Sequence, residues 1–283
     1  MRSLSMKEGS AAKFMTQSGA IIGLAPWLRT PVGRYVLAWE QAQLDQGVAD
    51  IFGFHALQLG LPELDALRAN RMPDRWLALD PQADVAPPDA EPALGPTRSA
   101  VLRCDFDALP LDSQSLDLVV LPHALELARD PHLALREVER VLRPEGRVVI
   151  IGLNPASLLG LRQRLGRLRR RLALGTERPL YLPSEGEFIG YRRLRDWLRL
   201  LSFEVEAGRF GCYRPPFDSE KWLARCGWME AAGDRWWPVF GAVYFLVAVK
   251  RVRGMRLVGL VRQQRVAPKA APAVVAHTHK EAA

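Results

Sequence analysis

The chain has 283 residues, of which 48% are hydrophobic and 25% are charged. This length suits one large α/β domain with appendages or two small domains, and the apolar fraction is ample for a core. No apolar run reaches the roughly 18 residues of a membrane-spanning helix. The run at residues 20–28 is short and has no clear cleavage site, so it does not predict a signal peptide.

The net charge of +8 is unevenly distributed along the chain. Residues 1–153 hold 15 of the 39 basic and 20 of the 31 acidic side chains, which gives them a charge of −5. The remaining residues hold 24 basic and 11 acidic side chains, a charge of +13. This asymmetry predicts that an acidic partner would lie near residues 155–270.

The three cysteines, Cys104, Cys212 and Cys226, show neither metal-ligand spacing nor redox spacing. Isolated cysteines of this kind are typical of reduced packing residues in a reducing compartment. We therefore expect a cytoplasmic protein without a metal site.

The first clear element is a helix over residues 31–49. Thr30 can act as its N-cap, and Pro31 suits the first helical position because its missing N–H would be unpaired there anyway. Its apolar face consists of Val32, Tyr35, Val36 and Trp39. Residues 1–25 lack a periodic pattern and are expected to form a disordered leader.

Seven apolar runs predict strands. They cover residues 55–59, 76–79, 101–104, 116–121, 148–151, 203–212 and 243–250. Sequence compatible with a helix lies at 62–71, and residues 81–99, rich in Pro and Ala, read as a surface insertion. Strands that alternate with helices predict a parallel sheet covered on both faces.

A capped helix precedes the fifth predicted strand. Asp130 is its expected N-cap, and Pro144 is expected to stop it before a turn at residues 144–146. Its apolar stripe consists of Leu135, Val138 and Leu142. A later helix is predicted at 191–201, after a loop at 175–190.

Residues 156–174 predict a strongly basic amphipathic helix. Five leucines at spacings of three and four share one face: Leu158, Leu161, Leu165, Leu168 and Leu172. Arginines occupy much of the rest of its surface: Arg162, Arg164, Arg167, Arg169, Arg170 and Arg171. Two interpretations are open: the leucines pack on the domain or cover the active site, with the arginines in solvent, or the helix contacts an anionic membrane or RNA.

Residues 101–154 contain an ordered set of short motifs. These are Asp105 after a strand, Leu109-Pro110, Leu116-Asp117 at the start of a strand, Asp130-Pro131 at a helix start, and RVLRPEG at Arg140–Gly146. In this order and spacing they resemble the small class I S-adenosylmethionine-dependent methyltransferases of the methyltransferase type 11 group. The specific match covers about 55 residues, and a weaker match extends over roughly residues 50–250.

The resemblance implies an α/β fold with a Rossmann-like doubly wound sheet of about seven strands, mostly parallel and closed by a C-terminal antiparallel hairpin. It also implies S-adenosylmethionine as cofactor and an acceptor that we expect to be a small molecule. The methyltransferase domain would cover residues 26–252, with an insertion or cap at 155–200. A basic, mostly disordered tail would follow at 253–283.

In doubly wound sheets, ligands bind outside the carboxyl ends of the strands. Gly60 ends the first predicted strand, and Asp80 ends the second, which suits hydrogen bonds from ribose hydroxyls. The resemblance assigns Asp105 to the adenine amino group and places Phe106 beside the adenine ring. Leu121, at the end of the fourth strand, completes the predicted cofactor site.

The loop after the first strand departs from the family pattern. The family usually has an acid and three glycines there, whereas this chain reads LQLGLPELDAL with Gly60 alone. Gln58 stands in place of the acid and could accept one hydrogen bond from the methionine amino group. Two outcomes are open: a reshaped pocket that still binds the cofactor, or a catalytically inactive protein that keeps the fold for binding or as a scaffold.

His123 follows the fourth predicted strand and could act as a general base toward an acceptor hydroxyl. The alternative is a hydrogen-bonded structural histidine. The chain has no HExxH, GxSxG or P-loop motif, so the sequence does not support a hydrolase or a kinase. We expect the substrate site under a cap formed by residues 31–49, with Tyr35 and Trp39, and by the segment after Asn154.

Overall fold

The apolar runs form strands because their β-branched and aromatic side chains alternate between two buried faces. The computed structural model describes residues 24, 26–81, 100–171, 188–217 and 219–252. The strands of this part are β1 (His55–Leu59), β2 (Asp74–Leu79), β3 (Ala100–Arg103), β4 (Leu116–Pro122), β5 (Leu142–Leu153), β6 (Phe203–Gly211) and β7 (Val243–Lys250).

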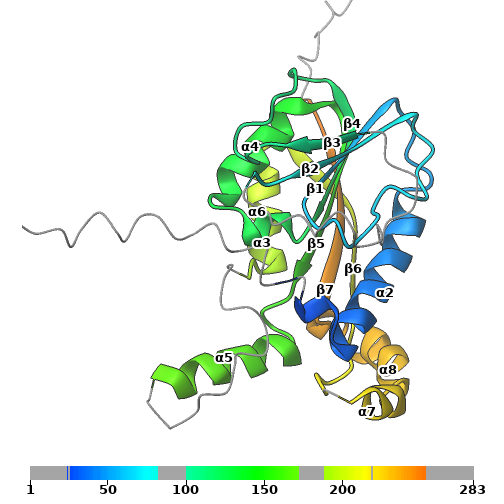
Figure 1. The fold of residues 1–283 in the computed structure, drawn as a ribbon, viewed down its shortest axis with the longest axis vertical. Helices are drawn as coiled ribbons and strands as arrows, with labels where there is room; N and C mark the ends of the chain where they lie inside the picture. The colour runs from blue at the N-terminus through cyan, green and yellow to red at the C-terminus, as the bar shows by residue number, and fades with distance from the viewer. Residues whose placement is uncertain (1–23, 25, 82–99, 172–187, 218, 253–283) are drawn as a thin grey trace, which may run out of the picture. The chain divides into compact units, whose positions relative to one another are not determined.

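These strands form one sheet in the order β3-β2-β1-β4-β5-β7-β6 (Figure 1). Strands β1 to β5 pair in parallel. Strand β7 pairs antiparallel to both β5 and β6. The predicted fold class, a mostly parallel Rossmann-like sheet with a C-terminal antiparallel hairpin, is confirmed.

The helices are α2 (Pro31–Gly47), α3 (Ala124–Leu127), α4 (Pro131–Val141), α5 (Leu158–Arg171), α6 (Tyr191–Leu200), α7 (Glu220–Arg225) and α8 (Trp228–Trp236), with a 3-10 turn η1 (Pro238–Phe240). Helix α2 begins at the predicted cap, because Thr30 Oγ1 accepts from the Gly33 N–H at 3.1 Å. Asp130 Oδ1 likewise caps α4. No helix in the described segments is long and apolar enough to cross a membrane.

The sheet is covered on both faces (Figure 1). Alternate residues of β7 enter two different core clusters: Phe245 belongs to the cluster that contains Val36 of α2. Its neighbour Tyr244 belongs to the cluster that contains Leu135 of α4 and Leu194 of α6. The sheet and its helices therefore form three layers, with α2 on one face and α4 and α6 on the other.

The family-like motif residues hold the scaffold together. Asp117 Oδ2 accepts from the backbone N–H groups of Phe54 and His55 at 2.7 and 3.0 Å, which fixes the entry to β1. Arg143 donates to the other oxygen of Asp117 at 3.1 Å. Arg140 of α4 donates to the carbonyls of Leu109 and Leu111 at 2.9 and 2.8 Å. These side chains join the β3–β4 connection to α4 and β5.

Two local predictions differ from the structure. Residues 62–71 form turns instead of a helix, because the side chain of Gln58 holds the backbone of this segment in another shape. The turn predicted at 144–146 lies inside β5 as an irregularity in its pairing with β4, with Glu145 at a φ of 65°. The early part of β5 therefore still pairs with β4, at Leu116 and Leu142.

Helix α5 does not pack through its leucine face. Its leucines at 158, 161, 165 and 168 are between 46% and 51% exposed. Leu159 and Gln163 are buried instead, at 3% and 1% exposure. The helix therefore rests on the domain through another face, and the expectation that its leucines are buried against the domain is wrong for these four.

Several predicted segments lie outside the described residues. They are the leader at 1–25 apart from Leu24, the insertion at 81–99 apart from Pro81, Leu172, most of the loop at 175–190, and the tail at 253–283.

Candidate functional site

The carboxyl ends of β1, β2 and β3 lie side by side at one edge of the sheet. Leu59 pairs with Ala78, and Leu79 pairs with Arg103, so the three strands end nearly level. Gly60 therefore comes directly after β1 at the edge where Asp80 follows β2. The neighbouring pair β1–β4 is the point at which the strand order reverses, the usual ligand position in doubly wound sheets.

Asp80 and Asp105 both act on one buried thiol. The pKa of Cys104 is raised to about 11 by burial, and the charges of Asp105 and Asp80 add to this effect. Asp105 is exposed and Asp80 is partly buried. The two carboxylates that the sequence predicts for the cofactor are therefore neighbours at the carboxyl edge, within reach of a polar ligand.

Gly60 lies near the ring of Phe106. Gly60 has a φ of 74°, a left-handed conformation that glycine adopts without strain. A Cβ placed on Gly60 would lie 3.7 Å from the Phe106 ring and 3.9 Å from Cβ of Ala124. Leu121 and Phe106 share one buried cluster. The structure thus brings Gly60, Phe106 and Leu121 together beneath the two carboxylates.

Gln58 holds the loop that replaces the glycine-rich motif. Its Nε2 donates to the carbonyls of Gly60, Leu61 and Leu64 at 3.0, 2.9 and 2.8 Å. Its Oε1 accepts from the Ala66 N–H at 3.1 Å. One buried amide thereby satisfies four backbone groups of a loop that forms no regular structure.

These contacts give Gln58 a different role from the predicted one. Its side chain is fully buried, and the acceptor oxygen that would receive the cofactor amino group already accepts from Ala66. The loop buries Leu61, Leu64 and Leu67 in the core cluster that contains residues of α2. In this structure, Gln58 therefore stabilises the loop beneath the cofactor edge and does not face a ligand.

His123 lies between two buried carboxylates. Its Nδ1 is 2.8 Å from Glu126 Oε2, and its Nε2 is 2.8 Å from Glu40 Oε1. The side chains of His123 and Glu40 are fully enclosed, and that of Glu126 is 5% exposed. A positive imidazolium at the centre of this Glu40–His123–Glu126 cluster would compensate one of the two carboxylate charges.

The surroundings of His123 favour the structural alternative over a base role. Burial alone would lower the pKa of the imidazole, but the charge of Glu40 and the hydrogen bonds to both glutamates raise it to about 10. Each ring nitrogen lies 2.8 Å from a glutamate oxygen inside a closed site, so neither faces an acceptor in this structure. We therefore assign His123 a structural role in place of the predicted catalytic one.

The Glu40–His123–Glu126 cluster joins three elements at the sheet edge. Glu40 comes from α2, His123 follows β4, and Glu126 comes from α3. Glu126 Oε1 also accepts from the backbone N–H of Leu153 at the end of β5. Burial raises the pKa of Glu126, and its contacts with His123 oppose that shift.

The sequence indicated that Glu40 is buried and needs a partner. Glu40 continues the four-residue spacing of buried positions in α2: Val32, Val36, Glu40 and Leu44. A carboxylate on the buried face of an amphipathic helix needs a partner of opposite charge. Sequence analysis identified His123 but neither partner: Glu126 lies three residues after His123, whereas Glu40 lies 83 residues before it and is brought close only by packing.

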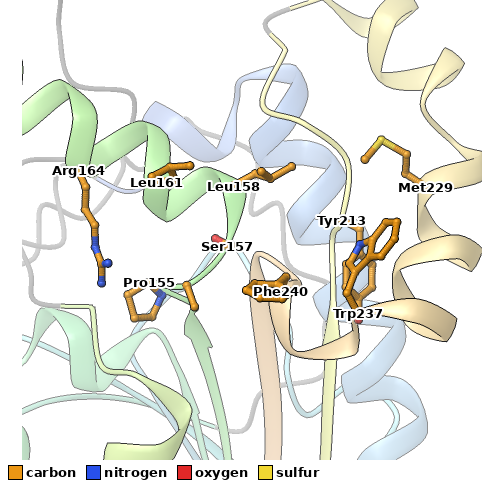
Figure 2. Close-up of a pocket in the computed structure, with 10 residues that line it drawn as sticks. Pro155, Ser157, Leu158, Leu161, Arg164, Tyr213, Met229, Trp237 and Phe240 are labelled. Atoms are coloured by element: carbon orange, nitrogen blue, oxygen red, sulfur yellow. The ribbon is translucent and has the colours of Figure 1, made fainter.

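An apolar pocket of about 450 Å³ opens beyond the carboxyl end of β5 (Figure 2). It is lined by Pro155, Ala156, Ser157, Leu158, Leu161, Arg164, Tyr213, Met229, Trp237 and Phe240. Asn154 holds its walls together, since its Nδ2 donates to the carbonyls of Val239 and Gly241 at 2.7 and 2.9 Å. The pocket therefore lies between the segment after β5 and the α8–η1 segment.

The pocket agrees with one part of the predicted cap. The segment after Asn154 lines it, as expected, whereas α2 contributes none of its lining residues. Trp39 lines a second, more polar groove beside β6. The Tyr35 ring lies 4.6 Å from the guanidinium carbon of Arg214. Tyr35 and Trp39, which were predicted to line the substrate pocket, do not line this pocket.

The contacts of Gln58 predict a stability effect. Gln58→Leu keeps the side-chain size but leaves three buried carbonyls and one N–H without their partner, so the free energy of unfolding should fall by at least about 2 kcal/mol. Urea unfolding followed by tryptophan fluorescence measures this loss. Gln46→Leu, at an exposed position, should change stability by less than about 0.5 kcal/mol. Equal effects of the two variants would contradict the role assigned to Gln58.

The Glu40–His123–Glu126 cluster predicts a pH-dependent stability. The pKa of folded His123, about 10, exceeds its ordinary value of 6.5, so its contribution is complete below pH 6.5 and is lost as pH rises through 10. His123→Gln should cost about 3–5 kcal/mol at neutral pH, because it leaves two buried carboxylates uncompensated. The stability difference from wild type should shrink between pH 6.5 and pH 10.

Thermal and urea unfolding at several pH values measure this difference. His132→Gln, at an exposed histidine, is the matched control and should show no such trend. A His123→Gln variant whose stability difference stays constant across that pH range would show that the imidazole is neutral in the folded protein.

Comparisons with known proteins agree with this architecture. A family profile described as a methyltransferase domain matches residues 68–150. The uncharacterized protein YafS of Escherichia coli is 32% identical over 185 residues, which cover 65% of this chain and 67% of YafS. A demethylmenaquinone methyltransferase of Chlamydia pneumoniae is 34% identical over 89 residues, 29% of this chain and 39% of that protein.

Two solved structures share the fold. A chain of the complex between the Haloferax volcanii Trm112 methyltransferase activator and a methyltransferase has a TM-score of 0.53 at 17% identity, covering 83% of this chain and 99% of that chain. An S-adenosylmethionine-dependent methyltransferase of Thermotoga maritima has a TM-score of 0.52 at 15% identity, covering 78% and 91%. By its strand order, the matched methyltransferase-domain profile and these structural neighbours, the chain has the class I methyltransferase fold.

Proposed function

We propose that the protein binds S-adenosylmethionine at the carboxyl edge of β1–β4 and transfers its methyl group to a small apolar acceptor. The observation that carries this proposal is the placement of Asp80 and Asp105 at adjacent strand ends, next to Gly60 and the ring of Phe106. The residues fit the nucleoside part of the cofactor, because carboxylates accept from ribose hydroxyls and from an adenine amino group.

The chain's own residues would act by binding and positioning. S-Adenosylmethionine, when bound, supplies an electrophilic methyl group. Asp80 would accept from the ribose hydroxyls and Asp105 from the adenine amino group, and the backbone at Gly60 allows close approach of the ligand. Since His123 is a buried cation, we propose that proximity and exclusion of water, without a histidine base, supply the rate enhancement.

The apolar pocket is the proposed acceptor site. It begins directly after β5, whose carboxyl end lies at the same sheet edge as Asp80 and Asp105. Its lining is mostly aromatic and aliphatic, with Arg164 as a charged group, so it suits an acceptor with an apolar body and an acidic substituent. The demethylmenaquinone named for the Chlamydia relative is a compatible kind of acceptor, although that match covers a short part of both chains.

A second function is favoured by the loop at residues 58–66. Its single glycine and its buried leucines leave it without the family's usual means of holding the methionine end. A protein that keeps the fold but lacks transfer activity would act as a binding or scaffold protein. Cofactor binding separates this function from the first.

Isothermal titration with S-adenosylhomocysteine tests the proposal. Wild type should bind, and Asp80→Asn should weaken binding by about 1.5–3 kcal/mol because it removes charged hydrogen bonds to the ribose. Asp50→Asn, at an exposed aspartate at the end of α2, is the matched control and should bind like wild type. If wild type gives neither heat nor a thermal shift with S-adenosylhomocysteine or S-adenosylmethionine, the protein is not a methyltransferase, and the scaffold function stands.

A further inference from the structure

We propose that α5 and the adjoining aromatic surface of α8 and η1 dock on an anionic lipid bilayer. The half-exposed leucines of α5, its arginines and the exposed tryptophans near the apolar pocket form this docking surface. The docking goes beyond the proposed function and does not depend on it.

The leucine stripe of α5 is half exposed: Leu158 and Leu161 line the apolar pocket, and Leu165 and Leu168 lie outside its lining. At about 100° per residue, Leu158, Leu161, Leu165 and Leu168 fall within a sector of about 80°. The buried residues Leu159 and Gln163 lie on a different side of the helix and anchor it. Arg162 also donates to the Pro216 carbonyl. The helix is therefore held on the domain while about half of each stripe leucine stays exposed, which leaves an apolar face that the described residues cover only in part.

Positive charge borders the stripe on both sides. On the helical wheel, Arg162 lies next to Leu158 on one side, and Arg164 lies next to Leu168 on the other. The helix ends in three consecutive arginines, Arg169–Arg171, and residues 155–171 contain no Asp or Glu. An apolar stripe flanked by arginines is the pattern of helices that lie in the headgroup region of anionic membranes.

The apolar pocket connects the stripe to an aromatic surface. Figure 2 shows Leu158 and Leu161 on the side of the pocket formed by α5, across from Trp237 and Met229. Large exposed side chains continue on this part of the chain: Trp222, Trp228, Trp236, Val239 and Phe240 are between 52% and 73% exposed. Exposed tryptophans are typical of membrane interfaces, where one part of the ring is apolar and the N–H stays hydrated.

The leucines decide between a bilayer and RNA. Arginines and aromatic rings alone would suit either, since both attract phosphate and RNA bases stack on rings. Leucine side chains make no such contacts with RNA, whereas the acyl region of a bilayer removes their surface from water. The occupant that satisfies the stripe and the arginines together is therefore an anionic bilayer.

The pocket opens on this docking surface. Leu158, Leu161 and Arg164 belong both to the docking helix and to the pocket lining. If the pocket is the acceptor site, an inference that rests on the proposed function, a membrane-embedded acceptor could enter it directly from the bilayer. Docking itself would remain if the acceptor proved to be something else.

Flotation of the full chain with vesicles tests the docking. Wild type should float with mixed phosphatidylcholine and phosphatidylglycerol vesicles at near-physiological salt, and much less with pure phosphatidylcholine. Leu165→Glu/Leu168→Glu, outside the pocket lining, should reduce flotation at least about tenfold, since it places charge in the apolar stripe. Leu200→Glu, at an 83% exposed leucine of α6, is the matched control and should float like wild type.

A charge reversal forms the second arm. Arg162→Glu/Arg167→Glu should reduce flotation and its dependence on anionic lipid, whereas Arg136→Glu/Arg192→Glu, on α4 and α6, should not. Circular dichroism and S-adenosylhomocysteine titration of each variant establish that the fold and the cofactor edge are unchanged. If the α5 variants lose flotation but keep the titration heat, the result supports docking through α5. If wild type floats but gives no titration heat, the result contradicts only the proposed function.

Three results would overturn the docking proposal. The first is that wild type remains in the dense fraction with anionic vesicles, and the second is that the stripe variant floats as well as Leu200→Glu. The third result is a gel shift with structured RNA at the same salt that is lost in the charge-reversal variant, without vesicle binding, which would identify a nucleic-acid surface instead.

Discussion

A buried positive charge between two buried carboxylates organises the carboxyl edge of this protein. Removing three charged groups from water is costly, and the cost is offset only when each charge is paired and hydrogen-bonded. The imidazole of His123 meets this condition in part: it lies 2.8 Å from an oxygen of Glu40 and of Glu126, while Oε2 of Glu40 is buried without a hydrogen-bond partner among the described residues. Because the three residues come from α2, the end of β4 and α3, their pairing fixes the helix on one face relative to the strand ends that carry the proposed cofactor contacts.

The loop after β1 also contains buried polar groups that need partners, and here the partner is an uncharged side chain. A segment that forms neither helix nor strand leaves buried carbonyls that need donors. The amide of Gln58 supplies them and allows Leu61 and Leu64 to pack into the core. The chain thus exchanges the flexible glycines of its family for a packed loop held from within, and this exchange leaves the methionine end of a cofactor site as the least family-like part of the molecule.

The motifs that identify the family mainly hold the scaffold. Asp117 closes the entry to β1, and Arg140 ties the β3–β4 connection to α4. A motif of this kind reports the fold because its side chains bridge elements that exist only in that fold. It says less about the acceptor, whose proposed pocket is built from segments outside residues 101–154, including Trp237 and Phe240.

The sequence by itself determined the elements and their class. Strand alternation, proline positions and the caps at Thr30 and Asp130 are local properties, so they predicted six of the seven strand positions closely and the starts of α2 and α4. The strand ends also located Asp80 and Asp105, because parallel strands place their carboxyl ends at one edge.

Tertiary structure alone decided the rest. The partners of His123 lie 83 residues before it, at Glu40, and three residues after it, and only packing brings the first of these close enough to fix the imidazole's charge. Likewise, periodicity predicts that the leucines of α5 share a face, but not which face the domain covers. That depends on Leu159 and Gln163 meeting a surface built by distant segments, and it leaves the leucine stripe half exposed.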